Sequence, residues 1–296
     1  MLSILIPTFN YNTFPLVKEL ESQCKQIEGL HYEIIVNDDS SIHIFENNQI
    51  QNLSNCYFYQ QKNNQGLSAS RNFLITKAAY PWCLFLDDDI WPTSNNFILK
   101  YINKIKEQSE ICVIFGGLEY SKKKPKSNEL LRWLYGNKYE ALTFMERSLI
   151  KPTHFLSSNL LVSKSILEQF SYPKEIMTYG YEDLIFNLKI IENNFRIFQL
   201  ENPVFHEKLD TSEIFLSKSK KALDNLSKSI HLGLLPKNAT GISKLYYKLN
   251  KNGLKRIITF SFKINQKWME KVLIGSKTNL TLFNIYRLGY FFSINK

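Results

Sequence analysis

Short apolar runs alternate with helical patterns along the first 115 residues, and this alternation restricts the fold more than any other feature. Five runs are typical of strands: 2–6, 33–36, 57–59, 83–86 and 111–115. The segments between them have the residue spacing of helices: 13–27, 67–79 and 94–110. Strands that alternate with helices form mostly parallel sheets with helices packed on the faces. We therefore predict an α/β fold with a doubly wound, mostly parallel sheet.

Polar and acidic side chains gather where three of these predicted strands end. The first strand leads into Pro7, Thr8 and Asn10, the second into Asp38 and Asp39, and the fourth into Asp87, Asp88 and Asp89. Ligands of such sheets bind outside the carboxyl ends of the strands, so these side chains are expected to form one site. Adjacent carboxylates without a counter-charge raise one another's pKa, so three consecutive aspartates favour a bound cation.

An arginine lies on the first turns of the helix predicted from residue 67. A helix start that carries Arg71 suits the phosphates of a nucleotide diphosphate. A metal held by oxygen ligands and shared with phosphates is a common role for exposed aspartates in this setting. Asp87 and Asp89 alternate along an extended chain, so one could reach a ribose and the other a divalent cation.

Five motifs occur in a fixed order: residues 4–10 (ILIPTFN), 33–40 (EIIVNDDS), 64–72 (NQGLSASRN), 85–89 (FLDDD) and 180–183 (GYED). Over residues 1–206 the chain resembles the family 2 glycosyltransferases, which have the GT-A fold and transfer a sugar from a nucleotide donor with inversion. The resemblance implies a nucleobase site at Thr8 with Asp38 or Asp39, and it puts Arg71 near the nucleotide and Asp87 near the ribose. Pro7, Asn10 and Asp88 would complete the donor site. Asp89 would ligate Mn²⁺ or Mg²⁺, and His206 stands where the family often has a second metal ligand.

The last motif opens a predicted helix whose apolar positions are Leu184, Leu188 and Ile191. Carboxylates on a first helical turn gain from the helix dipole, which is the structural explanation of Glu182 and Asp183. Inverting displacement at an anomeric carbon also needs a base on the acceptor side. By resemblance Asp183 is that base, and Glu182 binds the acceptor. Ser158 and Asn159 either contact the acceptor or cap a turn.

Charge is distributed unevenly and suggests a second domain. After residue 206, Lys and Arg outnumber Asp and Glu by 17 to 5, whereas acids slightly exceed bases before it. We expect a catalytic domain at 1–206 and a basic, mainly helical extension at 207–296. The apolar stretch 274–294 could lie on an anionic membrane as a peripheral helix, or it could pack on the protein. Nucleic-acid binding has no supporting motif.

The chain starts directly in a strand-like run, and no window reaches the roughly 18 apolar residues that span a bilayer. The four scattered cysteines are typical of buried, reduced thiols, so a cytoplasmic location is expected. Peripheral contact at the inner face of the cell membrane is the further expectation if the basic extension binds anionic lipid.

Three functional classes remain open at this point. The first is a metal-dependent hexosyl- or N-acetylhexosaminyl-transferase that uses a UDP-sugar and acts on a glycan or lipid-linked glycan in surface polysaccharide biosynthesis. The second is a sugar nucleotidyltransferase, but such enzymes have a glycine-rich loop after the first strand, and residues 7–10 contain no glycine. The third is a non-catalytic binding module. It predicts loss of the metal or base carboxylates, and Asp87, Asp89 and Asp183 are all present.

Overall fold

The computed structural model describes residues 1–43, 45–108, 111–150, 155–176 and 178–295, and the chain divides into two compact units. The first unit comprises Met1–Ser121, Glu140–Met177 and Glu182–Lys208. The second comprises Lys122–Tyr139, Thr178–Tyr181 and Leu209–Lys296. The change in charge near residue 206 lies beside the start of the last segment. No compositional feature pointed to the two earlier segments of the second unit.

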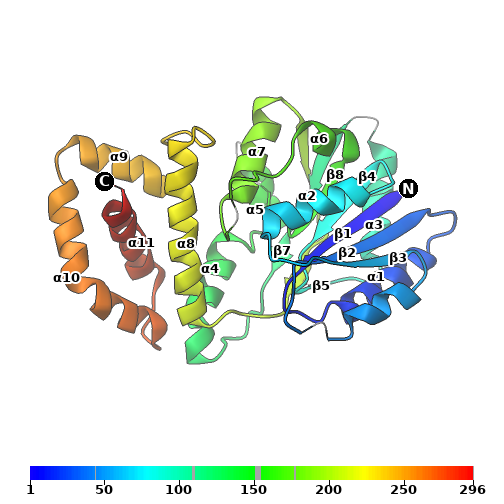
Figure 1. Cartoon of the computed structure of the whole chain (residues 1–296), viewed down its shortest axis with the longest axis horizontal. Coiled ribbons are helices and arrows are strands. Elements are labelled where there is room, and N and C mark those ends of the chain that lie inside the picture. Colours follow the sequence, from blue (N-terminus) through cyan, green and yellow to red (C-terminus); the bar gives the residue numbers. More distant parts are fainter. Residues whose placement is uncertain (44, 109–110, 151–154, 177, 296) are drawn as a thin grey trace. The chain divides into compact units, whose positions relative to one another are not determined.

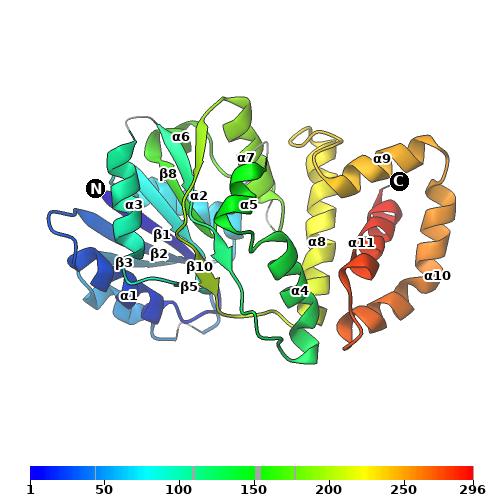
Figure 2. The same ribbon diagram turned by 180° about the vertical axis from the view of Figure 1, so that it is seen from behind.

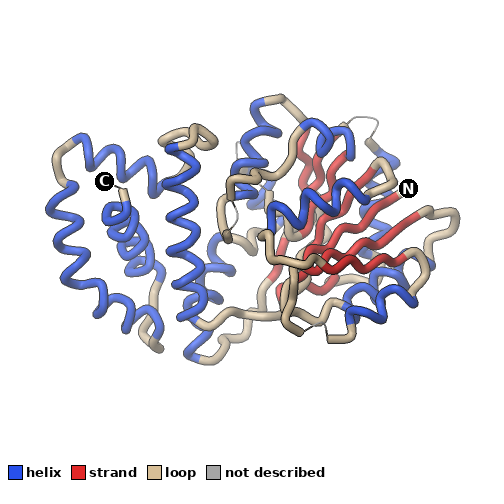
Figure 3. The backbone as a smooth tube through the Cα atoms, in the orientation of Figure 1, coloured by secondary structure: helices blue, strands red, loops and turns tan. Residues whose placement is uncertain are grey.

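A seven-stranded sheet forms the centre of the first unit within the described residues (Figure 3). Its order is β3-β2-β1-β4-β8-β6-β9. These strands are β1 (Leu2–Thr8), β2 (Tyr32–Asp38), β3 (Cys56–Gln60), β4 (Trp82–Leu86), β6 (Cys112–Phe115), β8 (Asn159–Ser163) and β9 (Arg196–Gln199). The four strands from β3 to β4 are parallel, β8 runs antiparallel to β4 and β6, and β9 is parallel to β6. The predicted mostly parallel α/β sheet is confirmed.

Helices cover both faces of this sheet. They are α1 (Phe14–Lys25), α2 (Leu67–Lys77), α3 (Phe97–Glu107), α5 (Phe144–Leu149), α6 (Lys164–Gln169) and α7 (Glu182–Glu192), with a short 3₁₀ helix at Asn47–Asn52. One face packs its apolar side chains against α2, α6 and α7 in a single core cluster. Figures 1 and 2, which view the molecule from opposite sides, show α2 over this face and α1 with α3 over the other. The three helices predicted from the sequence are confirmed with shorter ends, and residues 109 and 110 lie outside the described residues.

Helix α7 forms where the sequence predicted it, but the predicted apolar stripe is wrong. Its fully buried apolar residues are Ile185, Phe186 and Ile190, whereas Leu184 and Leu188 are only half-buried. Phe186 and Ile190 belong to the core cluster under the sheet. Both sides of this helix carry apolar residues, so periodicity alone could not decide which side faces the sheet.

Directly after the triple aspartate, the chain enters a small three-stranded sheet. Its order is β5 (Ile90–Pro92), β10 (Val204–His206) and β7 (Leu118–Glu119). The antiparallel pairing of β5 and β10 sets His206 opposite Ile90. This register brings the end of β10 beside Asp89, although the two residues are far apart in the sequence.

The second unit is helical. It contains α4 (Leu130–Tyr139), α8 (Ser212–His231), α9 (Gly241–Lys251), α10 (Lys255–Ile274) and α11 (Leu280–Ile294), with a 3₁₀ turn at Ser127–Glu129. Its core joins residues of α4, α8, α10 and α11. Phe283, Tyr286, Phe291 and Phe292 are buried, so the apolar residues of α11 serve the core of this unit, as the packing interpretation of 274–294 requires.

Two expectations drawn from composition concern the cysteines and membrane-spanning helices. The four cysteines are all buried and free, as predicted. Across the described parts of the chain, no helix combines the length and apolar character needed to cross a membrane.

Candidate active site

The register of the parallel strands brings together the polar and acidic segments that follow the first, second and fourth predicted strands. Thr8 is paired with Asp38 across β1 and β2, and Leu5 is paired with Phe85 across β1 and β4. Three residues further along the same pair of strands, the Thr8 hydroxyl donates to Asp88 Oδ2 at 2.7 Å, and the Phe9 N–H donates to the same oxygen at 3.2 Å. The predicted meeting of these segments at one sheet edge is therefore present.

The acidic cluster crowds negative charge into a partly enclosed place. Burial, with the neighbouring Asp89 carboxylate as the next cause, raises the pKa of Asp88 to about 8. Burial and nearby carboxylates, first among them Glu207, also raise the pKa of Tyr11 to about 12. Negative charges this close repel one another, and a bound cation would relieve that repulsion.

Asp89 and His206 form the pair that could hold that cation. The Nε2 atom of His206 lies 3.5 Å from Asp89 Oδ2, and the Glu207 N–H donates to the Asp89 carbonyl at 3.0 Å. The ring of Tyr120 stacks on His206 with centroids 5.0 Å apart and fixes the imidazole plane. No group of three or more His, Cys, Asp or Glu within the described ranges could hold a metal alone. Two protein ligands nonetheless fit Mg²⁺ or Mn²⁺, because such ions take their other ligands from substrate phosphates and water.

The predicted nucleobase residues fix the loops around the sheet edge. Asp38 accepts the Ser41 N–H at 2.6 Å, and Asp39 accepts the N–H groups of Gln65 and Gly66, both at 2.8 Å. Gly66 has a φ of +88°, which a glycine adopts without strain, and it leads directly into α2.

Asn10 and Pro7 occupy the turn and the strand before it. The Asn10 N–H donates to Ser41 Oγ at 2.6 Å, and its side-chain oxygen accepts the Ile42 N–H at 3.0 Å. Pro7 lies within β1 and is buried. Direct contact of the two residues, and of Asp38 and Asp39, with a nucleotide stays a prediction.

Arg71 joins the acidic cluster to the GYED motif. The residue is about 1% exposed, and its two terminal nitrogens lie 3.0 Å from Asp183 Oδ1 and 3.2 Å from Asp87 Oδ1. Glu182 lies 3.7 Å from the same guanidinium. A planar guanidinium is suited to binding several carboxylates at once. Arg71 therefore holds Asp87 and Asp183, which are 96 residues apart in the sequence, in one arrangement.

Asp183 is oriented by residues that the sequence analysis did not select. Ser157 donates its hydroxyl to Asp183 Oδ1 at 2.6 Å and its N–H to Oδ2 at 3.1 Å. The hydroxyls of Ser157 and Tyr172 are 2.7 Å apart, and the Tyr172 ring lies under Arg71 at 5.1 Å. Ser157 adjoined the predicted Ser158 in the sequence, whereas no motif signalled Tyr172.

The two residues predicted to contact an acceptor or cap a turn have different surroundings. Asn159 is fully buried, and its amide nitrogen donates to the carbonyls of Gly117 and Asn202 at 2.8 and 2.9 Å. Its side-chain oxygen accepts the Tyr101 hydroxyl at 2.7 Å, so the amide is used by the fold. Ser158 is buried beside Asp87, whose N–H donates to the Ser158 carbonyl at 3.3 Å.

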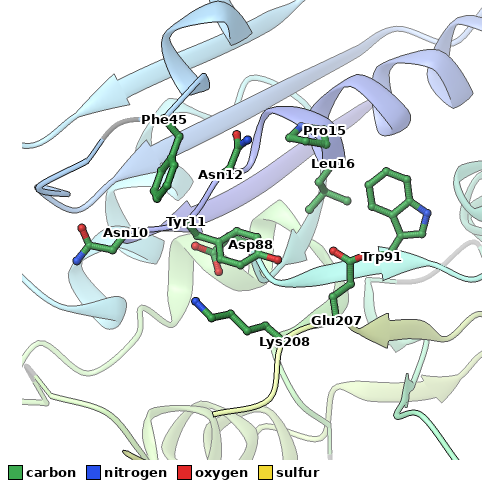
Figure 4. Close-up of a pocket in the computed structure, with 10 residues that line it drawn as sticks. All are labelled: Asn10, Tyr11, Asn12, Pro15, Leu16, Phe45, Asp88, Trp91, Glu207 and Lys208. Atoms are coloured by element: carbon green, nitrogen blue, oxygen red, sulfur yellow. The ribbon is translucent and has the colours of Figure 1, made fainter. Parts of the chain in front are cut away.

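A cleft of about 380 Å³ opens beside Asp88 (Figure 4). Residues from the β1–α1 loop, the triple aspartate and the segment after β10 line it: Asn10, Tyr11, Asn12, Pro15, Leu16, Phe45, Asp88, Trp91, Glu207 and Lys208. The ammonium of Lys208 lies 5.5 Å from the centre of the Tyr11 ring. Aromatic rings beside a carboxylate and an ammonium group are typical of a pocket for a polar small molecule.

Comparison with protein families identifies the chain. The model described as glycosyl transferase family 2 matches residues 3–170. The chain belongs to glycosyl transferase family 2. The sequence-based identification of the family is thereby confirmed. Comparison with curated protein sequences gave no significant match.

Solved structures similar to this family 2 chain share its fold at low identity. A mannosyltransferase from Pyrobaculum calidifontis, in complex with GDP-Man and Mn²⁺, matches at 14% identity with a TM-score of 0.52, over 78% of this chain and 64% of its own. Glucosyl-3-phosphoglycerate synthase from Mycobacterium tuberculosis, with Mn²⁺, UDP and phosphoglyceric acid, matches at 16% identity with a TM-score of 0.52, over 77% of this chain and 78% of its own. Residues 1–349 of S. aureus TarS with UDP-GlcNAc match at 16% identity with a TM-score of 0.50, over 97% of this chain and 90% of their own. The predicted GT-A fold is confirmed.

The lengths of these proteins differ from that of the present chain. A match to a longer structure of S. aureus TarS covers only 39% of that protein, and the match to the mannosyltransferase covers 64%. The family 2 chain thus spans less than two thirds of several of the proteins that it resembles.

The buried arginine leads to a prediction about the stability of this family 2 chain. Arg71→Ala should lower the free energy of unfolding by about 3–5 kcal/mol, because it leaves the partly buried carboxylates of Asp87, Glu182 and Asp183 without their shared cation. Urea unfolding followed by circular dichroism measures the change. Lys77→Ala, an exposed cation on the same helix, should change stability by less than about 1 kcal/mol. Equal stability of the two variants would contradict the bridging role.

Proposed function

We propose that this chain transfers a sugar from a nucleotide diphosphate donor to a hydroxyl of a glycan or lipid-linked glycan, with inversion at the anomeric carbon. The observation that carries the proposal is the link through Arg71, which connects the acidic cluster at the sheet edge to Asp183. For a direct displacement, the donor site and the base must lie close enough together to act on the same acceptor hydroxyl. Membership of family 2 supports the same reaction.

The donor and its cation belong at the Asp87–Asp89 cluster. Asp89 and His206 would hold Mn²⁺ or Mg²⁺, and Asp87 would accept from a ribose hydroxyl. When bound, the cation would neutralise charge on the departing diphosphate. A UDP-sugar is the donor that we favour. Similar structures contain UDP, UDP-GlcNAc or GDP-Man, which supports a nucleotide sugar and leaves the base and the sugar open.

The cleft beside Asp88 would receive part of this donor. Lys208 offers a charge that suits a phosphate, while Tyr11 and Trp91 offer ring faces and polar hydrogens. The Tyr11 phenol is protonated at neutral pH, as an unperturbed tyrosine also is, so the hydroxyl can donate to a ligand oxygen. None of these three residues belongs to the five motifs.

Asp183 is the base in this proposal, and its hydrogen bonds indicate which oxygen acts. Oδ1 already accepts from Arg71 and from the Ser157 hydroxyl, whereas Oδ2 accepts only the Ser157 N–H among the hydrogen bonds of the described residues. A carboxylate oxygen has two lone pairs, so Oδ2 retains one that can take the proton of an acceptor hydroxyl. Ser157 is a positioning residue, and Glu182 lies one residue away, where it could contact the acceptor.

A panel of nucleotide sugars tests the proposal. The protein is incubated with each sugar and Mn²⁺, and release of the nucleoside diphosphate is followed by chromatography. We expect release from one donor or a small group of donors, faster with a suitable glycan acceptor and absent in EDTA. Release of inorganic pyrophosphate from a sugar phosphate and a nucleoside triphosphate would instead indicate a nucleotidyltransferase.

A further inference from the structure

Helix α10 exposes a row of large apolar side chains. Ile257, Phe260, Ile264 and Trp268 are 67, 69, 65 and 59% exposed, and they follow one another at spacings of three, four and four residues. Such spacing places all four on one side of a helix. Single exposed apolar residues are common on protein surfaces, but a continuous row on one helix face marks an interaction site. We call these four residues the α10 apolar row.

The opposite side of the same helix is occupied by the core of the helical unit. Phe262, Met269 and Leu273 are buried there and pack in the cluster that also includes residues of α11. Figure 1 shows α10 beside α11 in this unit. The α10 apolar row therefore cannot turn inward without removing those three residues from the core.

Basic residues border the row along one side. Arg256, Lys263, Lys267 and Lys271 are all exposed. At 3.6 residues per turn they lie about 30–110° around the helix from the row, on the same flank. The acid of this helix, Glu270, is engaged by other residues, since its carboxylate accepts the Tyr286 hydroxyl at 2.5 Å and lies 3.6 Å from Lys220. The exposed flank of the row is thus positive.

We infer that the α10 apolar row docks on the surface of an anionic phospholipid bilayer. The inference is independent of the proposed sugar transfer. Isoleucine, phenylalanine and tryptophan side chains on one helix face enter the boundary between headgroups and acyl chains, and flanking lysines gain from anionic headgroups. A second copy of the chain would suit the apolar row alone, but it would bring two basic flanks together. The location differs from the one considered in the sequence analysis, where residues 274–294 were the alternative for membrane contact.

Vesicle co-sedimentation of the full chain tests this inference. Wild-type protein should bind vesicles that contain phosphatidylglycerol, and binding should weaken with salt and on pure phosphatidylcholine. The double variant Phe260→Ser/Trp268→Ser should bind at least about tenfold more weakly, because it removes the two largest apolar side chains of the row. Lys263→Glu/Lys267→Glu should lose binding to the anionic vesicles selectively.

A matched control separates this row from apolar surface in general. Ile214→Ser/Leu232→Ser changes two exposed apolar residues at the ends of α8 and should leave vesicle binding unchanged. All three variants alter exposed side chains, and their thermal unfolding by circular dichroism should match that of the wild type. Equal co-sedimentation of Phe260→Ser/Trp268→Ser and wild type would overturn the inference. So would a wild-type dimer that dissociates in this variant while neither protein binds vesicles.

Discussion

Asp89→Ala is expected to lower kcat/KM for sugar transfer by at least about 100-fold and to weaken nucleotide binding at the same time. The carboxylate lies 3.5 Å from His206, and in the proposed reaction these two residues would hold the cation that meets the diphosphate. A cation shared with the donor acts in the bound ground state and in the transition state, so its loss reduces affinity and turnover together. Steady-state kinetics and calorimetric titration with the nucleoside diphosphate measure the two effects.

Glu119→Ala is the matched control for this substitution. Glu119 is an exposed acid on β7, in the same small sheet as His206, and it should be dispensable for both measurements. His206→Ala should act in the same direction as Asp89→Ala. Normal donor affinity and normal turnover in Asp89→Ala would remove this carboxylate from the site.

Asp183→Asn is expected to lower transfer by about 10²–10⁴-fold while donor affinity is retained, because a positioned base acts only when the acceptor loses its proton. The amide keeps the size of the side chain, and its oxygen can still accept from Arg71 or Ser157. Kinetics at saturating acceptor, together with nucleotide titration, separate this variant from Asp89→Ala.

Ser157→Ala provides the graded comparison for Asp183→Asn. It removes one hydrogen bond to the Asp183 carboxylate and leaves the carboxylate in place, so the loss in transfer should be smaller. Near-normal transfer by Asp183→Asn with a good acceptor would transfer the role of base to Glu182.

The sheet and the meeting of its acidic segments could be predicted because both follow from local patterns. Five apolar runs gave the strands β1, β2, β3, β4 and β6, and parallel pairing requires their carboxyl ends to lie at one edge. The closeness of Asp89 and His206 depended on resemblance, since it arises from the three-residue strands β5 and β10. Strands this short leave no periodicity that could be recognised in the sequence.

The residues that hold Asp183 could not be predicted by the same reasoning. Ser157 reaches Asp183 because β8 runs antiparallel beside β4, and no turn signal announces that reversal. Tyr172 follows α6 outside any motif, and its position under Arg71 is a product of tertiary packing. Asn159 looked like a polar residue near an acceptor, but a buried amide with several partners has the same appearance in a sequence.

The second unit shows the same limit for apolar segments. Composition indicated a basic, helical extension, and the apolar richness of residues 274–294 drew attention to α11. Packing buries Phe283 and Phe292 there, while Phe260 and Trp268 of the less apolar α10 remain exposed. Hydrophobicity alone does not decide which of two neighbouring helices faces the solvent.

Calorimetric titration of the wild-type protein with UDP and with GDP, each in Mn²⁺ and in excess EDTA, is the decisive measurement for the proposed cation site. We expect one of these nucleotides to bind in Mn²⁺, and EDTA to remove most of the affinity. We also expect Asp89→Ala in Mn²⁺ to behave like the wild type in EDTA. Undiminished affinity of the wild type in EDTA would contradict a cation site at Asp89 and His206.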